Sequence, residues 1–365
     1  MSAPSACASR SSLRASSAAL ASRRAAALLA PLRQPLRTEL DGLRVTYVPF
    51  LAPPRPRSYA AWGAWAAPSL AAALRALRRS FPFELVHAHY ASPAGEAVRR
   101  TRPGVPTVIS AHGGDVLATA EDSPAGRAAV RRAFGAAALV LANSRVIEAR
   151  CVALGAARTR VVHLGTDLPA SSAPAARAQR RAGEPPALVT VAHLVTRKRH
   201  GDVLRAMWLL RDSHPGLRWV VVGDGPERGA LERQAADLGL AGRVEFRGAL
   251  GHDEAVAAAR TGTAFVLPSI DEAFGVAYVE AMAAGVPAIG ARGEPGPEEI
   301  AAAGGGIRLV APGDPEALAA ELRTLLDDPS YRRELGREAR ATVEASFTWP
   351  RCGEATVAAY EEALR

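Results

Sequence analysis

Short apolar runs alternate with amphipathic stretches along most of the chain. In the first half of the chain the apolar runs have a composition typical of β-strands. In the stretches between these runs, the apolar residues recur at helical spacing. From Leu43 onward these runs read LRVTYV, FELVHAHY, PTVISAH, ALVLANS and RVVHLGTD. Strands that alternate with helices predict a parallel sheet.

The alternation stops once and then resumes. Residues 169–186 read PASSAPAARAQRRAGEPP, a composition typical of a linker. Beyond them the strands are ALVTVAHL, LRWVVVGDG, RVEFRG, TAFVLPS, VPAIGA and GIRLV, and a mainly helical tail begins near Pro315, with a break at Phe347-Thr348-Trp349-Pro350. We therefore predict an α/β protein with two doubly wound Rossmann-like halves, whose ligands bind at the carboxyl ends of the strands in the cleft between them.

The same pattern gives the predicted domain boundaries. The divisions are an extension over 1–38, an N-terminal domain over 39–170, a linker over 171–186, a C-terminal domain over 187–345 and a last helix over 346–365 that crosses back to the first domain. The extension has six arginines and no acidic residue before Glu39, like a transit peptide. We expect it to be disordered or to reflect a misassigned start.

Charge is unevenly distributed over the 365 residues. Residues 1–180 carry 24 Arg and 9 acidic residues, a net +15, whereas residues 181–365 carry 21 basic and 27 acidic residues, a net −6, which together give +9. A basic half suits a phosphorylated substrate, an anionic membrane surface or nucleic acid. Coding bias explains it equally well, because 44 of the 45 basic residues are arginine.

The remaining composition excludes other classes. No stretch has the roughly 20 apolar residues that a membrane span needs. The three cysteines are far apart and odd in number, so they form neither a disulfide framework nor a metal cluster. A reducing, cytoplasmic setting is therefore predicted.

The only lysine, Lys198, stands between Arg197 and Arg199, after the first strand of the second half and before a helix. Three consecutive cations repel one another, but beside a helix N-terminus they offset the charge of a phosphate group. A solvated basic turn is the alternative. Because arginine replaces lysine everywhere else, we favour an anion-binding role for a compact ammonium group.

Two glutamates flank the start of a later helix. Glu272 is predicted in the loop after TAFVLPS and Glu280 about two turns into the next helix, so both can face one ligand at different depths. Carboxylates accept hydrogen bonds from sugar hydroxyls, and the N–H groups of Phe274 and Gly275 point toward negative charge. A surface salt bridge is the alternative for either glutamate.

The glycine turn Gly223-Asp224-Gly225-Pro226 follows the strand LRWVVV. Such a turn lets backbone N–H groups approach a diphosphate, but the spacing is not the dinucleotide fingerprint. A tight strand-to-helix turn is an equal alternative.

Other polar residues have simpler interpretations. His87 and His89 have a spacing that a metal could use, but two ligands are too few for a metal site. We expect His163 and His214 to be structural or exposed. Asp115 is predicted either to cap the next helix or to contact the substrate.

From about residue 40 to residue 362 the chain resembles the family 4 retaining glycosyltransferases, which have the two-domain GT-B fold. It is most similar to bacterial enzymes of cell-surface polysaccharide assembly, of the teichuronic or colanic acid type. The matching segments are HAHYASPAGEA, SAHGGDV, ANS, VVHLGTD, VAHLVTRKRH, VVGDGPE, RVEFRG and, most specific, PSIDEAFGVAYVEAMAAGVPAIG.

The resemblance implies roles for particular residues. Glu272 would bind hydroxyls of the donor sugar, Glu280 the nucleotide ribose, Lys198 the diphosphate, and His112 the sugar from the opposite domain. The catalytic residues are then Lys198, His112 and Glu272, and the donor-binding residues are His193, Arg197, Lys198, Gly223, Phe274, Gly275 and Glu280. The resemblance also implies retention of configuration without a metal, and no D-x-D metal motif occurs in the chain.

Two features depart from the family pattern. His193 stands where many members carry arginine, and Arg197 or Arg199 can replace its charge. Residues 1–42 contain no strand with a Gly-rich loop and a helix, which normally help to form the acceptor site. We expect either that the N-terminal domain lacks its first βαβ unit or that the start is misassigned.

The expected protein is a transferase of class EC 2.4 with no cofactor. It would move a sugar from a UDP- or GDP-linked donor to a lipid-linked, phosphorylated or saccharide acceptor, in the cytoplasm at the inner face of the membrane, with no nucleic acid partner. The alternatives are a nucleotide-sugar epimerase and a non-catalytic nucleotide-sugar-binding protein.

Overall fold

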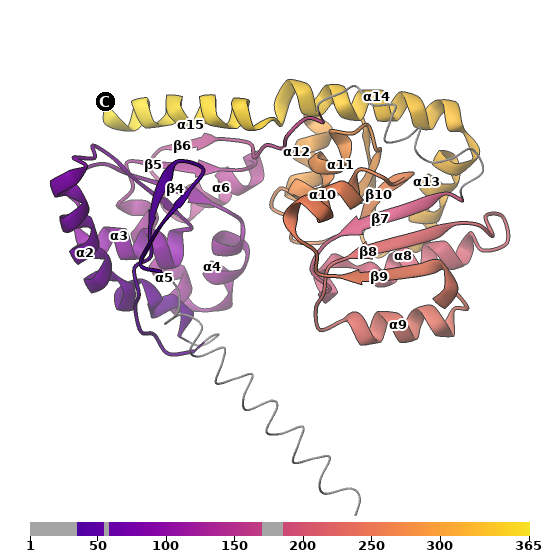
Figure 1. Ribbon diagram of the computed structural model, residues 1–365, viewed down its shortest axis with the longest axis horizontal. Coiled ribbons are helices and arrows are strands. Elements are labelled where there is room, and N and C mark those ends of the chain that lie inside the picture. Colours follow the sequence, from indigo (N-terminus) through magenta and orange to yellow (C-terminus); the bar gives the residue numbers. More distant parts are fainter. Residues whose placement is uncertain (1–34, 55–57, 170–184) are drawn as a thin grey trace, which may run out of the picture. The chain divides into compact units, whose positions relative to one another are not determined.

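The computed structural model describes residues 35–54, 58–169 and 185–365, and its elements are labelled in Figure 1. The chain divides into two compact units, Met1–Leu51 and Ala52–Arg365. Most of the predicted extension and of the predicted linker lie outside the described residues.

The described part of the small unit contains a β-hairpin. Strands β1 (Arg37–Leu40) and β2 (Leu43–Thr46) pair in antiparallel fashion, with Leu40 opposite Leu43. The two residues between them, Asp41 and Gly42, have φ values of 49° and 79°. Two left-handed residues in a two-residue loop match the twist of a hairpin, and Asp-Gly is a strong signal for it. The prediction that LRVTYV begins the parallel series was therefore wrong.

The larger unit begins with a parallel sheet of four strands among the described residues. Their order is β3 (Val86–His89), β4 (Thr107–Ala111), β5 (Leu139–Ala142) and β6 (Thr159–Val161). The neighbouring helices are α2 (Trp62–Ser80), α3 (Glu96–Thr101), α4 (Ala120–Asp122), α5 (Pro124–Gly135) and α6 (Arg145–Ala153). Because right-handed crossovers that step one way place their helices on one face, α3, α5 and α6 cover the same side of this sheet. Their buried residues pack with Ile109 and Val140.

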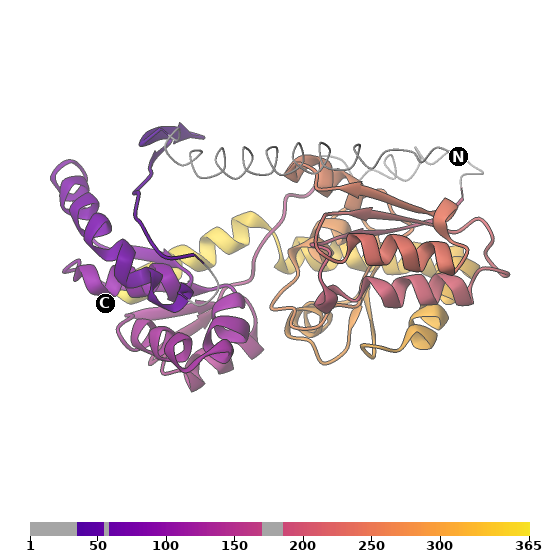
Figure 2. The same ribbon diagram turned by 90° about the horizontal axis from the view of Figure 1, so that it is seen from below.

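The last helix of the chain covers the other face of this first sheet. Helix α15 (Trp349–Leu364) packs Ala359 and Ala363 against Val108 and Leu141, and it runs beside the sheet in Figures 1 and 2. Neighbouring strand residues point to opposite faces, so each strand contributes to two cores. Residues from the two ends of the large unit thus build one layered structure.

A second parallel sheet has six strands among the described residues. Their order is β12 (Ile307–Val310), β11 (Ala288–Ala291), β10 (Ala264–Leu267), β7 (Ala187–Val191), β8 (Arg218–Val222) and β9 (Val244–Gly248). The strand order reverses between β7 and β10, so helices cover both faces. These helices are α8 (His200–Leu209), α9 (Arg228–Asp237), α10 (His252–Ala259), α11 (Val276–Met282), α12 (Pro295–Ala303), α13 (Pro315–Asp327) and α14 (Pro329–Ser346).

Alternation along β10 shows how the second sheet fills both cores. Val266 packs with residues of α8, α9 and α13, whereas Phe265 packs with residues of α11, α12 and α14. Two Rossmann-like parallel sheets with helices on their faces confirm the predicted α/β class. No helix among the described residues has the length and apolar character needed to span a bilayer.

The predicted break in the helical tail is also confirmed. Helix α14 ends at Ser346 and α15 begins at Trp349, with Phe347 fully buried between them. The Thr348 side chain caps α15 by accepting a hydrogen bond from the Arg351 N–H, and a proline in the first helical turn lacks only a donor that would be unpaired there.

Candidate functional site

Two loops meet where the strand order of the second sheet reverses. Strands β7 and β10 are parallel neighbours, so the loops that follow them lie at the same sheet edge. The Ile270 N–H donates to the Arg197 carbonyl at 2.8 Å, which ties the two loops together. Ligands of open α/β sheets bind at this reversal point, which places the predicted basic loop and acidic loop at one candidate site.

Lys198 and Glu272 form a buried ion pair there, although they are 74 residues apart in the chain. Each is 9% exposed, and the Lys198 ammonium donates to the Glu272 carboxylate. The Ser269 hydroxyl donates to the same carboxylate at 2.9 Å. The pair satisfies both charges, and it leaves two of the three ammonium N–H donors for a ligand.

The two arginines beside Lys198 are directed elsewhere. Arg199 Nε donates to Asp202 Oδ2 at 2.5 Å, within the first turn of α8. Arg197 is exposed and donates to the Asp271 carbonyl at 3.3 Å. Lys198 is therefore the one cation of the predicted triplet that is buried at the strand reversal, while Arg197 borders it from the solvent side.

Left-handed backbone flanks both members of the pair. Arg199 and Asp271 have φ values of 54° and 55°, conformations that are strained for residues other than glycine. The Glu294 carboxylate holds the second loop by accepting from the Glu272 N–H at 3.2 Å. The sequence analysis missed Glu294, although an acidic residue three positions after the buried strand β11 was a signal that could have found it.

The start of α11 is shaped by Gly275. Its φ is 81°, and a Cβ atom there would lie 2.5 Å from the ring of Tyr278. Phe274 is buried, and its side chain packs in the core with residues of α11 and α14. Both residues follow Glu272 closely in the chain, and their predicted donor-binding role stays a prediction.

Glu280 lies in the second turn of α11, as the fifth residue of a helix that begins at Val276, so the predicted depth of about two turns was too large. The side chain is 9% exposed and has no hydrogen-bond partner among the described residues. Burial raises the pKa of its carboxyl, and the charges of His252 and Arg260 oppose that change. A buried carboxylate with open acceptor positions is suited to bind hydroxyl groups.

The glycine turn after β8 is close to the same edge but is used by the fold. A Cβ atom on Gly223 would lie 1.9 Å from the Ala192 carbonyl oxygen. The Gly223 N–H donates to the Gly248 carbonyl at 2.8 Å. A Cβ atom on Gly225 would lie 2.3 Å from the Leu194 carbonyl oxygen. These contacts favour the tight-turn interpretation. In the loop after β7, His193 is exposed and stands between Ala192 and Leu194, whose carbonyl oxygens these glycines approach.

His112 of the first sheet comes close to the ion-pair loop. It follows β4, and the next residue, Gly113, is so close to Ala273 that an added Cβ atom would lie 2.2 Å from the Ala273 Cβ. The Ser144 hydroxyl donates to the Ala273 carbonyl at 3.1 Å. The structure therefore brings the loop of His112 into contact with the loop of Glu272, and the predicted donor contact of His193 stays a prediction.

Asp115 fixes the loop that carries His112. Its fully buried carboxylate accepts from the Ala91 N–H at 2.9 Å and from the His112 N–H at 3.1 Å, so it joins the loops after β3 and β4. Burial raises the pKa of Asp115, and these backbone hydrogen bonds oppose that change. Asp115 therefore joins two loops in the described structure, and its predicted contact with the substrate stays a prediction.

Three imidazoles form a line at the edge of the first sheet. The ring centroids of His87 and His89 are 4.4 Å apart, and His89 Nδ1 is 2.9 Å from His112 Nε2. His87 also hydrogen-bonds to Tyr360 at 2.6 Å and to Ser110 at 2.8 Å. Burial, and then the neighbouring imidazoles, lowers the pKa of both His87 and His112 to about 4. The two rings are therefore uncharged at neutral pH.

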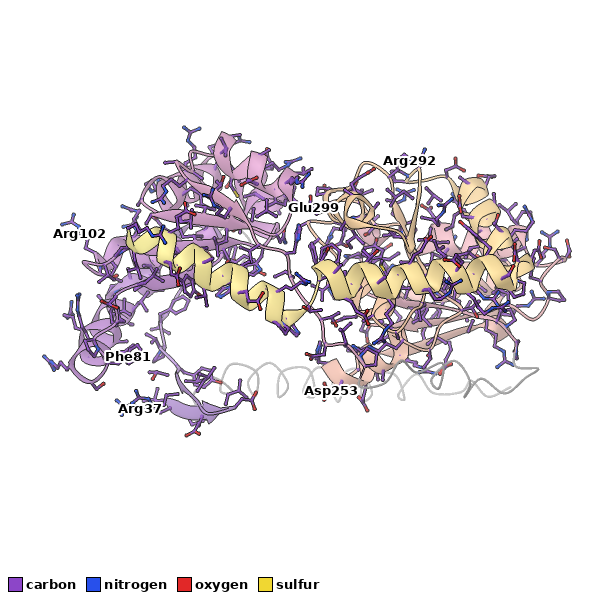
Figure 3. The ribbon with its side chains drawn as sticks, turned by 90° about the horizontal axis from the view of Figure 1, so that it is seen from above. Arg37, Phe81, Arg102, Asp253, Arg292 and Glu299 are labelled. Carbon is purple, nitrogen blue, oxygen red and sulfur yellow. The ribbon has the colours of Figure 1, made fainter. Side chains whose placement is uncertain are left out.

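Within the described ranges, no group of three or more His, Cys, Asp or Glu residues is arranged to hold a metal. His163 donates or accepts at 2.8 Å with Glu299 of α12, which is labelled in Figure 3. His214 bonds in the same way to Asp327 at 3.0 Å. Both histidines therefore have a carboxylate partner, and the His163 ring also stacks on Phe274 with ring centroids 6.2 Å apart.

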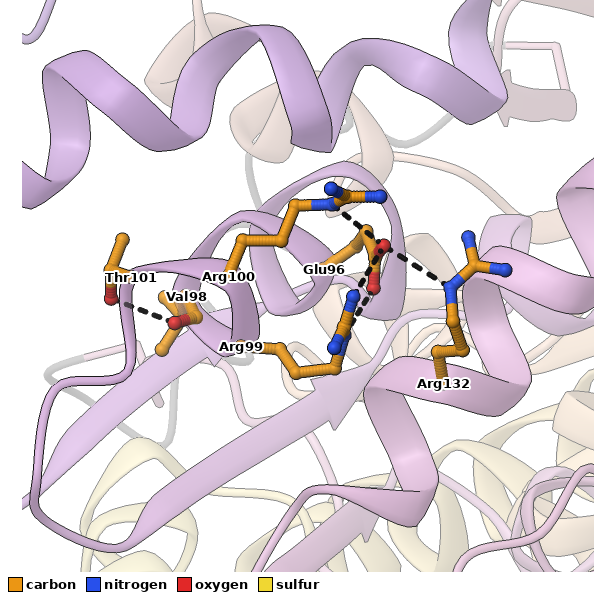
Figure 4. Close-up of polar contacts among 6 residues, drawn as sticks. All are labelled: Glu96, Val98, Arg99, Arg100, Thr101 and Arg132. Atoms are coloured by element: carbon orange, nitrogen blue, oxygen red, sulfur yellow. Dashed lines mark hydrogen bonds and ion pairs between the residues drawn. The ribbon is translucent and has the colours of Figure 1, made fainter.

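A second buried carboxylate is fully occupied by partners. Figure 4 shows Arg99, Arg100 and Arg132 around Glu96, with nitrogen-to-oxygen distances of 2.7, 2.9 and 3.3 Å. Burial alone would raise the pKa of Glu96, but the arginines, Arg99 foremost, bring it below its ordinary value. Its partners come from α3 and α5, so this cluster joins helices and leaves no acceptor position for a ligand.

Two family models match the chain. The one described as Glycosyltransferase Family 4 matches residues 17–170, and the one described as Glycosyl transferases group 1 matches residues 173–342.

Two curated relatives match different shares of the chain. The 2-deoxystreptamine glucosyltransferase of Streptomyces kanamyceticus is 31% identical over 293 residues, which cover 73% of this chain and 74% of that protein. Glycogen synthase of Mycobacterium tuberculosis is 33% identical over 211 residues, which cover 58% of this chain and 50% of that protein. The chain thus spans half the length of the glycogen synthase that it matches.

Solved structures show the same fold. Sucrose-phosphate synthase of Thermosynechococcus elongatus has a TM-score of 0.76 at 24% identity, with 90% of this chain and 86% of that chain covered. Anabaena HepE in complex with UDP-glucose has a TM-score of 0.66 at 22% identity, with 82% and 84% covered. At these identities the likeness confirms the GT-B architecture and carries no further conclusion.

Proposed function

Since the chain belongs to the family 4 glycosyltransferases, we propose that it is a retaining, metal-independent transferase of class EC 2.4 that uses a nucleoside-diphosphate sugar. One observation carries the proposal. The buried pair of Lys198 and Glu272 lies at the strand reversal of the second sheet, and α11, which follows the Glu272 loop, carries the buried carboxylate of Glu280, for which the described residues provide no hydrogen-bond donor. This combination offers a cation for a diphosphate and carboxylates for hydroxyl groups.

Lys198 stabilises the leaving group in this mechanism. When the bond between the anomeric carbon and the diphosphate oxygen breaks, its electron pair stays on the diphosphate, which gains negative charge. A positioned ammonium in a water-poor site stabilises that charge more than it stabilises the bound donor. Arg197, and the N–H groups at Gly275 before α11, add positive potential. His193, which is exposed in the loop after β7, contacts the diphosphate from the solvent side.

The two glutamates divide the donor between them. Glu272 accepts hydrogen bonds from hydroxyls of the transferred sugar, and Ser269 and Lys198 hold its carboxylate in place. Glu280 accepts hydrogen bonds from the ribose, since its carboxylate has no other partner among the described residues. UDP- and GDP-linked sugars both contain these groups, and the Anabaena HepE structure holds UDP-glucose.

His112 acts from the first sheet. As a neutral imidazole it hydrogen-bonds to the sugar without adding charge near the oxocarbenium-like centre. The acceptor oxygen forms the new bond to the anomeric carbon on the face that the diphosphate leaves, and its proton passes to a diphosphate oxygen. Retention follows without a covalent intermediate on the protein, and no side chain serves as a nucleophile.

The wider role that we propose is polysaccharide or glycolipid synthesis, of the teichuronic or colanic acid type. The net charge of +15 over residues 1–180 supports work at the inner, anionic face of the membrane. Binding to anionic vesicles should then fall steeply with salt, because the Debye length is only about 10 Å at 0.1 M. Equal binding to neutral vesicles would contradict the membrane part of the proposal.

A product assay tests the transferase proposal. UDP-glucose and GDP-mannose are incubated with the protein, with and without added hydroxyl acceptors and with a chelator in a parallel series. Nucleoside diphosphate release that depends on the acceptor, with an α-linked product by NMR in the presence of chelator, is the expected result. Release or epimerisation without any acceptor would indicate an epimerase, and binding without turnover would indicate a non-catalytic protein.

A further inference from the structure

A cavity of about 310 Å³ lies at the carboxyl ends of β3, β4 and β5, between the first sheet and α15. The line of three imidazoles forms one wall, and the opposite wall comes from α15 and from the segment after β6. Ligand pockets span roughly 300–1,000 Å³, so this one has room for a single ring rather than an oligosaccharide.

The described residues that line the cavity carry no acidic or basic side chain apart from histidine. They are His87, His89, Ser110, Ala111, His112, Leu141, Ala142, Asn143, Val162, Leu164, Trp349, Cys352, Thr356 and Tyr360. Burial lowers the pKa of each of the three histidines, so the wall is uncharged at neutral pH. In a first half that is rich in arginine, such a lining is selective against ions, because an unpaired charge is disfavoured there.

Asn143 supplies an unused polar group on this wall. It is the only asparagine of the chain, it is 5% exposed, and its Oδ1 has no hydrogen-bond partner. A buried amide oxygen without a partner is unfavourable unless a ligand or water donates to it. His87 uses both ring nitrogens on the hydroxyls of Tyr360 and Ser110, and His89 Nδ1 bonds to His112 Nε2. Among the described residues, the second nitrogens of His89 and His112 therefore remain beside the Asn143 amide as uncharged polar atoms of the cavity.

The cavity adjoins the loop that approaches Glu272. His112 lines it, and the neighbouring Gly113 touches Ala273, the residue after Glu272. A ring bound between Asn143 and His112 would therefore present a hydroxyl toward the donor sugar held by Glu272. The aromatic face of Trp349 and the aliphatic side chains of Leu141 and Val162 suit the C–H faces of such a ring.

We propose that this cavity is the acceptor subsite and that it takes one uncharged hydroxylated ring, a sugar or a cyclitol, rather than a phosphorylated ring. The inference rests on the proposed transferase function and narrows its acceptor class. A ring that carries a phosphate would place two negative charges against an uncharged wall, with no described guanidinium or ammonium lining it.

Direct binding to the full-length protein tests the subsite without any donor. Methyl α-glucoside and myo-inositol are compared with glucose 6-phosphate and myo-inositol 1-phosphate, and the imidazole C–H signals of His87, His89 and His112 are followed by NMR. The uncharged rings should shift these signals in a saturable way, and the phosphates should bind at least about tenfold more weakly. Tighter binding of the phosphates, or no saturable shift with either uncharged ring, would overturn the inference.

Two substitutions on one helix provide a matched pair. Thr356 lines the cavity, whereas Val357, the next residue of α15, is 55% exposed. Thr356→Trp should fill the cavity and weaken the uncharged rings at least about tenfold, whereas Val357→Trp should leave their affinity unchanged. Equal affinities in the two variants would place the ring elsewhere.

A third variant removes the unpaired amide. Asn143→Leu keeps a similar volume and should weaken the uncharged rings about fivefold, the usual effect of losing one uncharged hydrogen bond. Folding is checked in every variant by its affinity for UDP and GDP, the ligands proposed for the second sheet. A wild type that binds neither UDP nor GDP would contradict the transferase proposal. A wild type that binds a nucleotide but none of the uncharged rings would contradict only the subsite.

Discussion

The carboxyl ends of the two sheets have opposite chemistry. In the second sheet this edge holds a buried lysine and two buried glutamates, Lys198, Glu272 and Glu280. In the first sheet it holds three imidazoles and an unpaired amide, and its one deeply buried acid, Asp115, is taken up by backbone N–H groups. The same architectural position thus offers charge on one side and uncharged hydrogen-bonding groups on the other.

The difference teaches that net charge does not report the chemistry of a site. Residues 1–180 have the larger positive charge, yet the carboxyl edge of their sheet presents uncharged imidazoles, and three of the described arginines surround Glu96 instead. Residues 181–365 are acidic overall, yet their sheet edge contains the one lysine. Placement at the ends of strands matters more than composition.

Among the substitutions considered, removal of Lys198 should lower turnover the most. We expect Lys198→Ala to reduce turnover by roughly 10²–10³, because a positioned stabiliser of the leaving group is lost. Lys198→Arg should retain part of the activity, since the charge remains but the compact ammonium does not. Initial rates with UDP- and GDP-linked sugars give the comparison.

Arg197→Ala is the reference for that measurement. Arg197 is the exposed neighbour, so its loss should lower the rate much less than the loss of Lys198. Full activity of Lys198→Ala together with inactivity of Arg197→Ala would assign the clamp to the arginine instead.

The cluster around Glu96 should matter for stability rather than turnover. Glu96→Gln removes the carboxylate that neutralises three guanidiniums, and we expect a loss of about 2–3 kcal/mol in the free energy of unfolding, below the range for fully buried pairs because the arginines are partly exposed. Urea denaturation measures it.

An exposed ion pair supplies the control for Glu96. Arg127 and Glu121 are 2.6 Å apart, and both side chains are 48% exposed. Glu121→Gln should change the free energy of unfolding by only about 0–1 kcal/mol. Similar losses in the free energy of unfolding in the two variants would show that the three arginines around Glu96 add no more stability than an exposed ion pair.

Acid stability should change least, and His200 is the residue to test. Burial, and then the charge of Lys198, lowers the pKa of His200 from 6.5 to about 4. The His200 ring takes up a proton below pH 6.5 in the unfolded chain but only near pH 4 in the folded chain. The stability associated with the neutral ring is therefore complete above pH 6.5 and is lost as the pH falls from 6.5 to 4.

His200→Leu should therefore flatten the fall in stability between pH 6.5 and pH 4. At pH 8 the variant should be at least as stable as the wild type, because both ring nitrogens of His200 are buried without a hydrogen-bond partner. Urea midpoints at several pH values measure both effects. An unchanged slope would mean that His200 does not titrate in this window.

Much of the fold could be predicted from local patterns. Alternating apolar runs gave both parallel sheets, and the Phe347–Pro350 break gave the start of α15, because these signals act within a few residues. The hairpin of β1 and β2 was missed because LRVTYV was interpreted by its apolar run, while the Asp41-Gly42 turn signal beside it was not used.

The site was predictable as a set of residues but not as a set of contacts. The basic loop and the acidic segment were both recognised, yet their ion pair depends on β7 and β10 being neighbours, which strand order alone decides. Glu294 and Asp115 act by binding backbone N–H groups of loops far from them in the chain. No local pattern encodes such partners.

The central claim is that Glu272 and Glu280 bind different parts of one nucleotide-sugar donor. The most direct test is calorimetric titration of UDP and UDP-glucose, or GDP and GDP-mannose, into Glu272→Gln and Glu280→Gln. Glu280→Gln should weaken the free nucleoside diphosphate and the intact donor alike, by about tenfold or more, since a hydrogen bond to a charged group is lost. Glu272→Gln should weaken the intact donor and leave the nucleoside diphosphate nearly unchanged. Equal losses for both ligands in both variants, or no loss in either, would contradict the account.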